Sequence, residues 1–575
     1  MKCENRIPYL NFLLRNLSAL PHKIGEQMKQ TLHRIFPRGF PPILLNVAVA
    51  TYVIFALNSL FWQHLLEILS DDTFALIGLL SAFWMLTILI IELLAPGPLQ
   101  RPMLAILIIL SAAANYYGKT FGARIDQEMV RTIFATTLTE SRHLLTLNLV
   151  IQITLTGLIP ALIVWKTPTR QRRILHQLWR WPVGITASLG LMLTILYSDY
   201  QTYSSVIREH RELTVSYQPG ATLSAMFKVL RQEFRADTGP IKTVAADVHR
   251  GSQMEASGKP VLMILFVGET VRSKNFGLSL EAPKTTPNLV GHDLVYLPNT
   301  ESCGTLTAVS VPCMFSPLSS GEYTRSAFRG SENLTDVVAR AGFNVHWWDN
   351  NTGDQNIMRS RDWKKVDRLW DPDVCYTGEC TDAIFLPLIR ETLDTIEEDT
   401  LLILHMIGSH GPAYHLRYMP QRAIFKPTCD TAEFSNCTTK EIVNSYNNSI
   451  VETDYVLSET IKLMSASKKA DTAMIYVSDH GESLGEGGLY LHGAPKFLAP
   501  EEQTKVPFLI WLGRSYQERL GVSHDCLRNY ADGPTSHDML FHSVLGLLDL
   551  ETVDLRPDLN LTSNCAVKGS VNGAW

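Results

Sequence analysis

The chain has 575 residues, a length that predicts at least two domains. Apolar residues make up 46% of it and the mean hydropathy is +0.04, but the apolar residues concentrate before residue 200. The formal net charge of -5 gives no global basic excess, which argues against a nucleic-acid-binding protein.

Five apolar runs with few charges occur in the first 200 residues. Each has 17 to 22 residues. A hydrocarbon core of about 30 Å needs about 20 helical residues, so each run can span a bilayer. The alternative is a set of buried core helices in a soluble protein, but five such runs in so short a stretch favour membrane spans. The runs cover residues 43–63, 74–94, 102–118, 144–165 and 182–198.

Lys and Arg residues predict the orientation of these spans. Seven precede the first run and five lie between the fourth and fifth runs, whereas residues 64–73 contain none and residues 119–143 contain four. The more basic side is expected to face the cytoplasm, which places residues 199–575 outside it. The first run begins too late for an ordinary cleaved signal peptide, so we expect it to be retained.

The cysteines agree with this orientation. Cys3 falls on the cytoplasmic side, and the other eight all follow the last span. An even number on one side indicates disulfides in an oxidising compartment such as a periplasm. A cysteine–zinc site is the alternative, but no C-x-x-C spacing occurs. Close spacing favours the pairs Cys303–Cys313, Cys375–Cys380 and Cys429–Cys437, and elimination leaves Cys526–Cys565.

Residues 199–258 form a bridging segment between a membrane domain, residues 1–198, and a catalytic domain, residues 259–575. Within the bridge, apolar side chains recur at helical spacing and basic ones lie on other faces, as in an amphipathic helix on a membrane surface. A plain packing helix fits the periodicity equally well. The apolar positions are Leu223, Met226, Phe227, Leu230 and Phe234. Residues Gly251 to Lys259 are small and polar and indicate a linker.

Short apolar runs characterise the catalytic domain. Runs this short are typical of strands buried on both faces of a parallel sheet. Helical stretches such as Ile442 to Met464 separate them, and the alternation predicts a layered α/β domain. The runs are Val261 to Val267, Leu401 to Ile407, Ala473 to Val477 and Pro507 to Leu512.

Polar residues of metal-binding type lie just past the ends of these runs, where open parallel sheets bind ligands, and His405 lies within the second run. They are Glu269, His405, His410, Asp479, His480 and His492. Carboxylates and imidazoles suit zinc, and Glu269, Asp479 and His480 are our choice of ligands. For a lone Asp-His pair the alternative is a strand-end cap or a surface turn. The addition of Glu269 after a strand, with Gly481 permitting a tight turn, favours the metal site.

A hydroxyl-rich stretch, Ser302 to Cys313, offers a nucleophile. A disulfide across it would hold the loop rigid, and a Thr at the start of a helix could present its oxygen to the metal while backbone N–H groups receive a phosphate. Thr305, Thr307 and Ser310 are all candidates by composition. The alternative is a helix-capping cluster.

Four motifs together resemble the lipid A phosphoethanolamine transferases, a family that includes the mobile colistin-resistance enzymes. They are Gly268-Glu-Thr270, Cys303-Gly-Thr-Leu-Thr-Ala-Val-Ser-Val-Pro-Cys313, Gly408-Ser-His-Gly-Pro412 and Ser478-Asp-His-Gly-Glu-Ser-Leu-Gly485. The resemblance covers nearly the whole chain. It implies an α-helical membrane domain of five transmembrane helices and an α/β/α alkaline-phosphatase-like periplasmic domain, held in a bacterial inner membrane.

The resemblance also implies roles for individual residues. Thr307, the second Thr of the Cys-Gly-x-x-Thr motif, matches the nucleophile, and Glu269, Asp479 and His480 match zinc ligands, with Thr307 completing the set. His410 and His492 match histidines near the substrate phosphate or a second zinc.

In the membrane domain, Thr132, Thr136 and Glu140 stand where the family contacts the ethanolamine head group. Two positions depart from the family pattern. Thr132 replaces an expected Asn, and Gln355 replaces an expected Lys, which puts a charged substrate contact in doubt.

The implied reaction moves phosphoethanolamine from phosphatidylethanolamine onto a lipid A phosphate through a covalent adduct on Thr307. Zinc would lower the pKa of the Thr307 hydroxyl. We expect a monomer with no nucleic-acid partner. The product would replace a negative phosphate by a zwitterionic group and weaken binding of cationic peptides such as polymyxin.

Two classes of alternative remain. A transferase acting on lipopolysaccharide core sugar, a phosphoglycerol transferase or a sulfatase-like enzyme would share the zinc and the Thr. A membrane-anchored binding or sensor protein with an inactive domain is the other, although nucleophile, ligands and flanking histidines are all present.

Overall fold

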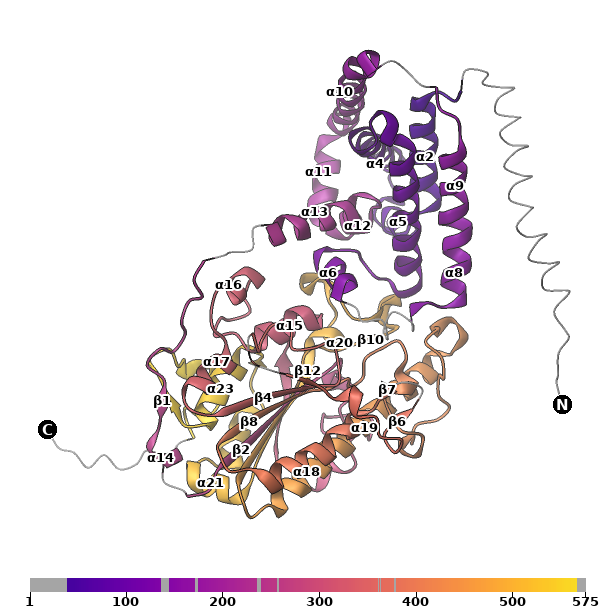
Figure 1. Cartoon of the computed structure of the whole chain (residues 1–575). Coiled ribbons are helices and arrows are strands. Elements are labelled where there is room, and N and C mark those ends of the chain that lie inside the picture. Colours follow the sequence, from indigo (N-terminus) through magenta and orange to yellow (C-terminus); the bar gives the residue numbers. More distant parts are fainter. Residues whose placement is uncertain are drawn as a thin grey trace, which may run out of the picture. The chain divides into compact units, whose positions relative to one another are not determined.

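The computed structural model describes residues 39–135, 144–170, 174–234, 239–255, 258–359, 361, 363–376 and 379–565 (Figure 1). The chain forms two compact units. The first comprises Met1–Gln127 and Leu147–Phe227, and the second comprises Glu128–Thr146 and Lys228–Trp575. We call them the membrane unit and the catalytic unit.

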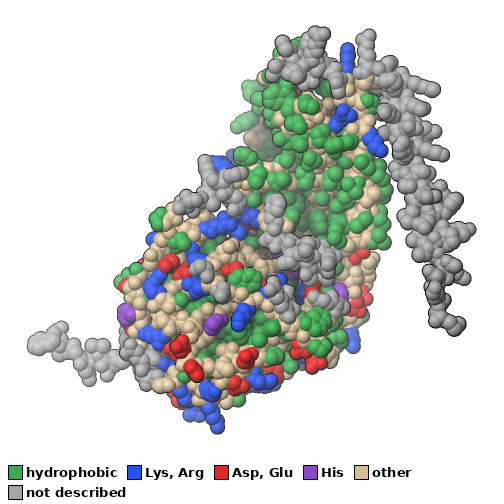
Figure 2. Space-filling view, viewed as in Figure 1, with side chains coloured by type: hydrophobic (Ala, Val, Ile, Leu, Met, Phe, Trp, Pro, Cys, Tyr) green, Lys and Arg blue, Asp and Glu red, His purple; other side chains and the backbone are tan. Residues whose placement is uncertain are grey.

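Apolar helices build the membrane unit. Within the described residues, four helical stretches are long and apolar enough to cross a membrane: Thr73–Leu94 (α4), Gly97–Phe121, Leu147–Lys166 and Trp181–Ser198. The second of these contains α5 (Gln100–Phe121), the third α8 (Leu147–Ile153) and α9 (Ile159–Lys166), and the fourth is most of α10 (Ile174–Ser198). Hydrophobic side chains cover much of their visible surface (Figure 2). Such a surface suits lipid rather than water.

The first predicted span differs from expectation because it is bent. It consists of α2 (Pro42–Ala56) and α3 (Ser59–Leu69), which meet at 69° and count together as a fifth span or a re-entrant segment. Asn58 at the break donates to Val53 O at 2.8 Å and accepts from Gln218 N at 2.7 Å, while Asn115 Oδ1 accepts from Ser59 N at 2.8 Å. These amides satisfy backbone groups that the broken helix leaves open.

Three short helices follow, namely α11 (Tyr200–Glu209), α12 (Arg211–Ser216) and α13 (Gly220–Phe234). The last covers the segment predicted as an amphipathic helix, and its Phe227 and Leu230 are 67% and 53% exposed. Its placement on a membrane surface stays a prediction.

The stretch predicted as a linker is instead docked where it is described. Strand β1 (His249–Arg250) pairs with β14 (Leu550–Glu551), and α14 (Ser252–Glu255) follows it. Gly251 N donates to Asp549 O at 2.6 Å, so small polar residues here mark close backbone packing rather than a free connection.

An eight-stranded sheet forms the centre of the catalytic unit. Its order is β13-β3-β12-β9-β2-β8-β4-β5. The bounds are β2 (Val261–Gly268), β3 (Val295–Glu301), β4 (Asn344–Asp349), β5 (Lys364–Lys365), β8 (Thr400–His405), β9 (Asp471–Ser478), β12 (Lys505–Leu512) and β13 (Thr535–Ser536). Strands β9, β2, β8, β4 and β5 run parallel, as predicted, but β12 pairs antiparallel with both β9 and β3.

Helices cover both faces of this sheet. Figure 1 shows α18 (Phe385–Thr395) and α19 (Thr439–Ala466) on one side, and α15 (Thr307–Met314), α17 (Leu334–Arg340) and α23 (Asp538–Leu547) on the other. Thr438 and Glu441 form a capping box that starts α19, the helix predicted over Ile442 to Met464. A layered α/β fold results, in agreement with the expected architecture.

The register of the central strands gathers their carboxyl ends at one edge of the sheet. Gly268 lies opposite Ser478, and Val267 and Asp349 both lie opposite His405. Whatever follows β2, β9, β8 and β4 is therefore brought to the same edge.

All four predicted disulfides are present: Cys303–Cys313, Cys375–Cys380, Cys429–Cys437 and Cys526–Cys565.

Candidate active site

Glu269, Asp479 and His480 meet at the carboxyl edge of the sheet. Glu269 follows β2, and the other two follow β9. One ligand atom from each lies within 4.8 Å of the others, and all three side chains are fully buried. His480 Nε2 is 3.5 Å from Glu269 Oε1 and 3.3 Å from Asp479 Oδ2.

Backbone contacts orient the last two of these side chains. The carbonyl of Gly481 lies 2.9 Å from His480 Nδ1, which holds the proton on that nitrogen and leaves Nε2 as the lone-pair atom. Asp479 Oδ1 accepts from Thr270 N and from His480 N, whereas Oδ2 is buried and has no hydrogen-bond partner among the described residues. Burial raises the pKa of Asp479 and lowers that of His480 well below its usual range.

These three side chains fit a metal ion. Two carboxylates and one imidazole are ligand types that zinc takes. A buried carboxylate oxygen without a hydrogen bond needs a positive partner, and the lone pair of His480 Nε2 lies beside it. Glu269, Asp479 and His480 therefore form a possible metal-binding cluster among the described residues.

Thr307 is the first residue of α15 and lies against the cluster. Its hydroxyl is 3.1 Å from Glu269 Oε2 and 3.4 Å from His480 Nε2. The other two hydroxyl candidates are engaged elsewhere, because Thr305 donates to Ala494 O at 2.6 Å and Ser310 accepts from Gly304 N at 2.9 Å. Thr307 is thus the one of the three whose hydroxyl contacts the cluster.

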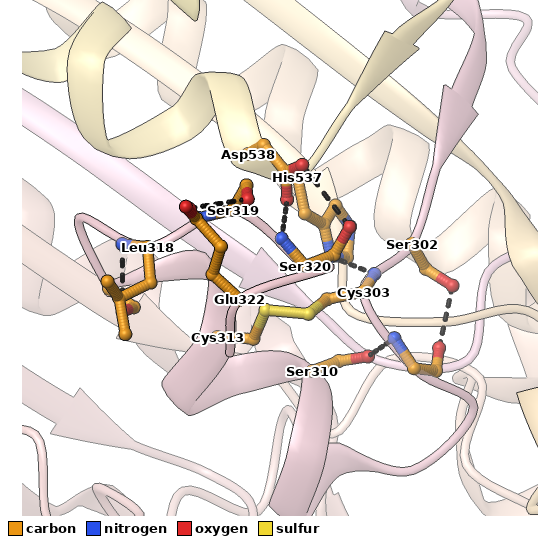
Figure 3. Close-up of a disulfide and its surroundings, with 12 residues drawn as sticks. Ser302, Cys303, Ser310, Cys313, Leu318, Ser319, Ser320, Glu322, His537 and Asp538 are labelled. Carbon is orange, nitrogen blue, oxygen red and sulfur yellow. Dashed lines mark hydrogen bonds between the residues drawn. A yellow bond between two sulfur atoms is a disulfide. The ribbon is translucent and has the colours of Figure 1, made fainter. Parts of the chain in front are cut away.

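A disulfide and hydrogen bonds hold the loop that precedes Thr307 (Figure 3). The Cys303–Cys313 disulfide joins the loop to α15. His537 accepts from Cys303 N at 3.1 Å through Nδ1 and donates from Nε2 to Ser478 O at 2.9 Å. This imidazole therefore ties the loop before α15 to the strand end that carries Asp479.

His410 and His492 lie next to the cluster. The ring centroids of His480 and His492 are 4.4 Å apart, and those of His410 and His492 are 5.6 Å apart. His492 Nδ1 lies 3.0 Å from Glu482 Oε2, and Tyr414 donates to the other Glu482 oxygen at 2.7 Å. Burial, with the nearby His492, lowers the pKa of His410 well below its usual range. Both imidazoles can accept or donate a proton beside the cluster.

Asn351 is a site residue that sequence reasoning missed. It donates from Nδ2 to Glu269 Oε2 at 2.7 Å. His405, which the sequence offered as a possible ligand, lies outside the cluster and contacts Asp349 Oδ1 at 2.8 Å and Asn351 Nδ2 at 3.3 Å. The available signal was Asp349-Asn-Asn351, a polar run at the end of β4.

The predicted head-group contacts are not among the side chains that the structure describes. Thr136 and Glu140 lie outside the described residues, and Thr132 falls within α6 (Gln127–Ala135) with its side chain not described. Gln355, where the family pattern has Lys, has a φ of 49° and donates to Thr352 Oγ1 at 3.0 Å.

Comparison with known proteins covers both parts of the chain. The family model described as phosphoethanolamine transferase EptA/EptB matches residues 83–234, and the sulfatase model matches residues 262–550. Phosphoethanolamine transferase EptA of Escherichia coli (strain K12) is 36% identical over 511 residues, covering 88% of this chain and 93% of the relative. The chain belongs to the phosphoethanolamine transferase family.

Further members of this family agree over most of their length. Phosphatidylethanolamine transferase Mcr-1 of Escherichia coli is 30% identical over 536 residues, covering 90% of this chain and 96% of the relative. The solved integral membrane lipooligosaccharide phosphoethanolamine transferase A (EptA) of Neisseria meningitidis superposes with a TM-score of 0.87 at 31% identity, covering 91% and 98% of the two chains. The expected fold, apolar helices followed by an alkaline-phosphatase and sulfatase-like domain, is confirmed.

Proposed function

We propose that this phosphoethanolamine transferase moves phosphoethanolamine from phosphatidylethanolamine to a lipid A phosphate through an adduct on Thr307. The observation that carries the proposal is the contact of the Thr307 hydroxyl with Glu269 and His480 at the start of α15. The names of the relatives support the group transferred and the donor, and the apolar helices suit an enzyme whose two substrates are lipids.

In the first half-reaction, Thr307 Oγ1 attacks the phosphorus of phosphatidylethanolamine. The Oγ1–P bond forms, the bond from phosphorus to the glycerol oxygen breaks, and diacylglycerol leaves with a proton. His410 or His492, the two imidazoles beside the cluster, accepts the proton that Thr307 loses and supplies the one that the leaving oxygen gains. Backbone N–H groups in the first turn of α15 can stabilise the phosphate oxygens.

In the second half-reaction, an oxygen of the lipid A phosphate attacks the phosphorus of the adduct. The Oγ1–P bond breaks, a diphosphate linkage forms, and Thr307 regains its proton. Because the lipid A phosphate exchanges one negative charge for a zwitterionic group, the product should bind polymyxin less well.

Glu269, Asp479, His480 and Thr307 would hold a zinc ion, and His410 with His492 would hold a second one if it is present. A bound zinc supplies Lewis-acid stabilisation of oxygen anions. The residues themselves position Thr307, exclude water and exchange protons. We further propose that the protein acts as a monomer in a bacterial inner membrane, with the catalytic unit in the periplasm.

The test follows the labelled head group through both half-reactions. Purified full-length protein is mixed with phosphatidylethanolamine labelled in the ethanolamine, and the adduct is mapped by mass spectrometry. Label on Thr307 that Thr307→Ala abolishes supports the nucleophile; label persisting in that variant contradicts it. Intact-mass analysis of lipid A from expressing cells then tests the acceptor, because a core-sugar enzyme leaves the lipid A mass unchanged.

A further inference from the structure

Two arginines on one helix of the catalytic unit lie near the start of α15, and the charge of a third, Arg131, acts on the first of them. We call Arg131, Arg325 and Arg329 the arginine cluster. Arg325 and Arg329 are the two ends of α16 (Arg325–Arg329), four residues apart and so on one face of the helix. Arg325 donates to Ala308 O at 3.4 Å, and Ala308 directly follows Thr307. The cluster is therefore anchored one residue from the proposed nucleophile.

Tyr323 is close enough to these arginines for their charges to affect its hydroxyl. Burial raises the pKa of its hydroxyl to about 12, and the charged groups that act on the hydroxyl are Arg325, Glu128, Arg131 and Arg329. Three of these groups are guanidinium groups and one is a carboxylate. The hydroxyl is itself buried and has no hydrogen-bond partner among the residues that the structure describes. A buried hydroxyl without a hydrogen bond calls for a partner, and a ligand oxygen would serve as one.

The cluster differs from a solvated surface patch in its burial. Arg131 is 9% exposed and pairs with Glu128 at 2.6 Å, Arg325 is partly buried, and Arg329 is exposed. Burial lowers the pKa of the Arg325 guanidinium, and the nearby Arg329 and Arg131 lower it further. Like charges removed from water repel one another, and a bound anion relieves that repulsion. Such an arrangement is typical of an anion-binding site.

We propose that the arginine cluster binds the phosphate of the acceptor lipid and delivers it to the adduct on Thr307, an inference that rests on the proposed function. Guanidinium groups bind phosphate oxygens through paired, charge-assisted hydrogen bonds. The acceptor is a phosphomonoester with nearly two negative charges, whereas the donor phosphate is a diester with one, so the acceptor gains more from several arginines. Because Arg325 contacts the residue after Thr307, a phosphate bound to it would lie close to the adduct.

The two half-reactions separate this role from a role in donor binding. Adduct formation is measured with labelled phosphatidylethanolamine alone, and transfer is measured from the preformed adduct to lipid A that carries a phosphomonoester. In Arg329→Gln, and in Arg325→Gln with Arg329→Gln, we expect adduct formation within about twofold of wild type. The KM for lipid A should rise about tenfold per arginine, because a charge-assisted hydrogen bond is lost each time. Lys at either position should recover part of the loss by restoring the charge.

Arg514→Gln is the matched control. Arg514 lies in the same unit, its side chain is 93% exposed, and its ion pair is with Glu518 of the same helix, so its loss should change neither half-reaction. If the double variant lowers the melting temperature, the single change at exposed Arg329 keeps the test decisive.

Two outcomes would overturn the inference. An unchanged KM for lipid A would show that the cluster does not bind the acceptor. A parallel fall in adduct formation would assign the cluster to the donor phosphate or to the fold. Failure of wild-type protein to form any adduct would instead contradict the proposed function itself, so the two failures are distinguishable.

Discussion

At the scale of single residues, Asn351 holds Glu269 in place. Its amide donates to Glu269 Oε2 and to Met406 O, and its neighbour Asn350 donates to Cys380 O and Asp382 Oδ1 instead. Because a hydrogen bond to a ligating carboxylate fixes its orientation, Asn351→Ala should lower zinc affinity about 10- to 100-fold. Competition with a chelator of known affinity measures this. Asn350→Ala, which loses buried bonds of the same kind away from Glu269, is the control. Equal affinity losses in both variants would show a general effect of packing.

Sequence patterns reach the residues that directly follow strands but not their partners. Glu269 and Asp479 could be found because polar residues after buried apolar runs collect at one sheet edge. The polar run at the end of β4 places Asn351 at the same sheet edge, but nothing in the sequence indicates that this residue, 82 positions from Glu269, contacts it. Gly481 was expected for a tight turn. The structure gives another reason, since a Cβ there would lie 2.0 Å from Glu502 O.

At the scale of elements, His537 joins the loop before α15 to the end of β9. Burial lowers its pKa to about 4, against about 6.5 in an unfolded chain. Between these two values the unfolded chain takes up a proton that the folded one does not. The contribution of His537 to stability is therefore complete above about pH 6.5 and is lost as the pH falls toward about 4, by at most about 3 kcal/mol.

Melting curves of His537→Gln and wild type test this dependence. The variant loses one of the two hydrogen bonds and should be less stable by about 1–2 kcal/mol near neutral pH. The gap should close and then reverse as the pH falls toward about 4, because wild type loses up to about 3 kcal/mol while Gln does not titrate. His249→Gln controls for the loss of an imidazole, since the His249 side chain is 63% exposed. A gap that stays constant with pH would contradict the buried neutral state of His537.

Burial along a strand decides whether that strand can be recognised in the sequence. Strands β2, β8 and β9 are buried along their whole length and appear as unbroken apolar runs. Strands β3 and β4 alternate between buried and exposed positions, and β3 includes Pro298, so neither stands out as a run. The direction of β12 could not be predicted either, because a strand buried on both faces looks the same in parallel and antiparallel pairing.

At the scale of the whole molecule, span positions and disulfides were the most predictable features. Membrane spans appear in the sequence as long apolar runs. Cysteines 10, 5 and 8 residues apart pair with their sequence neighbours. The bend between α2 and α3 was not predictable, because it depends on Asn115 and Gln218 from distant parts of the chain.

The stability of the whole protein should depend on zinc through Asp479. Burial raises the pKa of Asp479, which means that its ionised form destabilises the folded state at neutral pH until a cation compensates it. Zinc in large excess over its Kd should therefore raise the melting temperature of the chelator-treated protein by about 5–10 °C.

In Asp479→Asn the response to zinc should disappear. The metal-free variant should melt at or above the temperature of metal-free wild type, because the substitution removes a buried charge whose Oδ2 has no hydrogen bond among the described residues. A metal-free variant that melts well below wild type would mean that Asp479 stabilises the fold by itself, and the cluster would then lose its strongest argument for holding a metal.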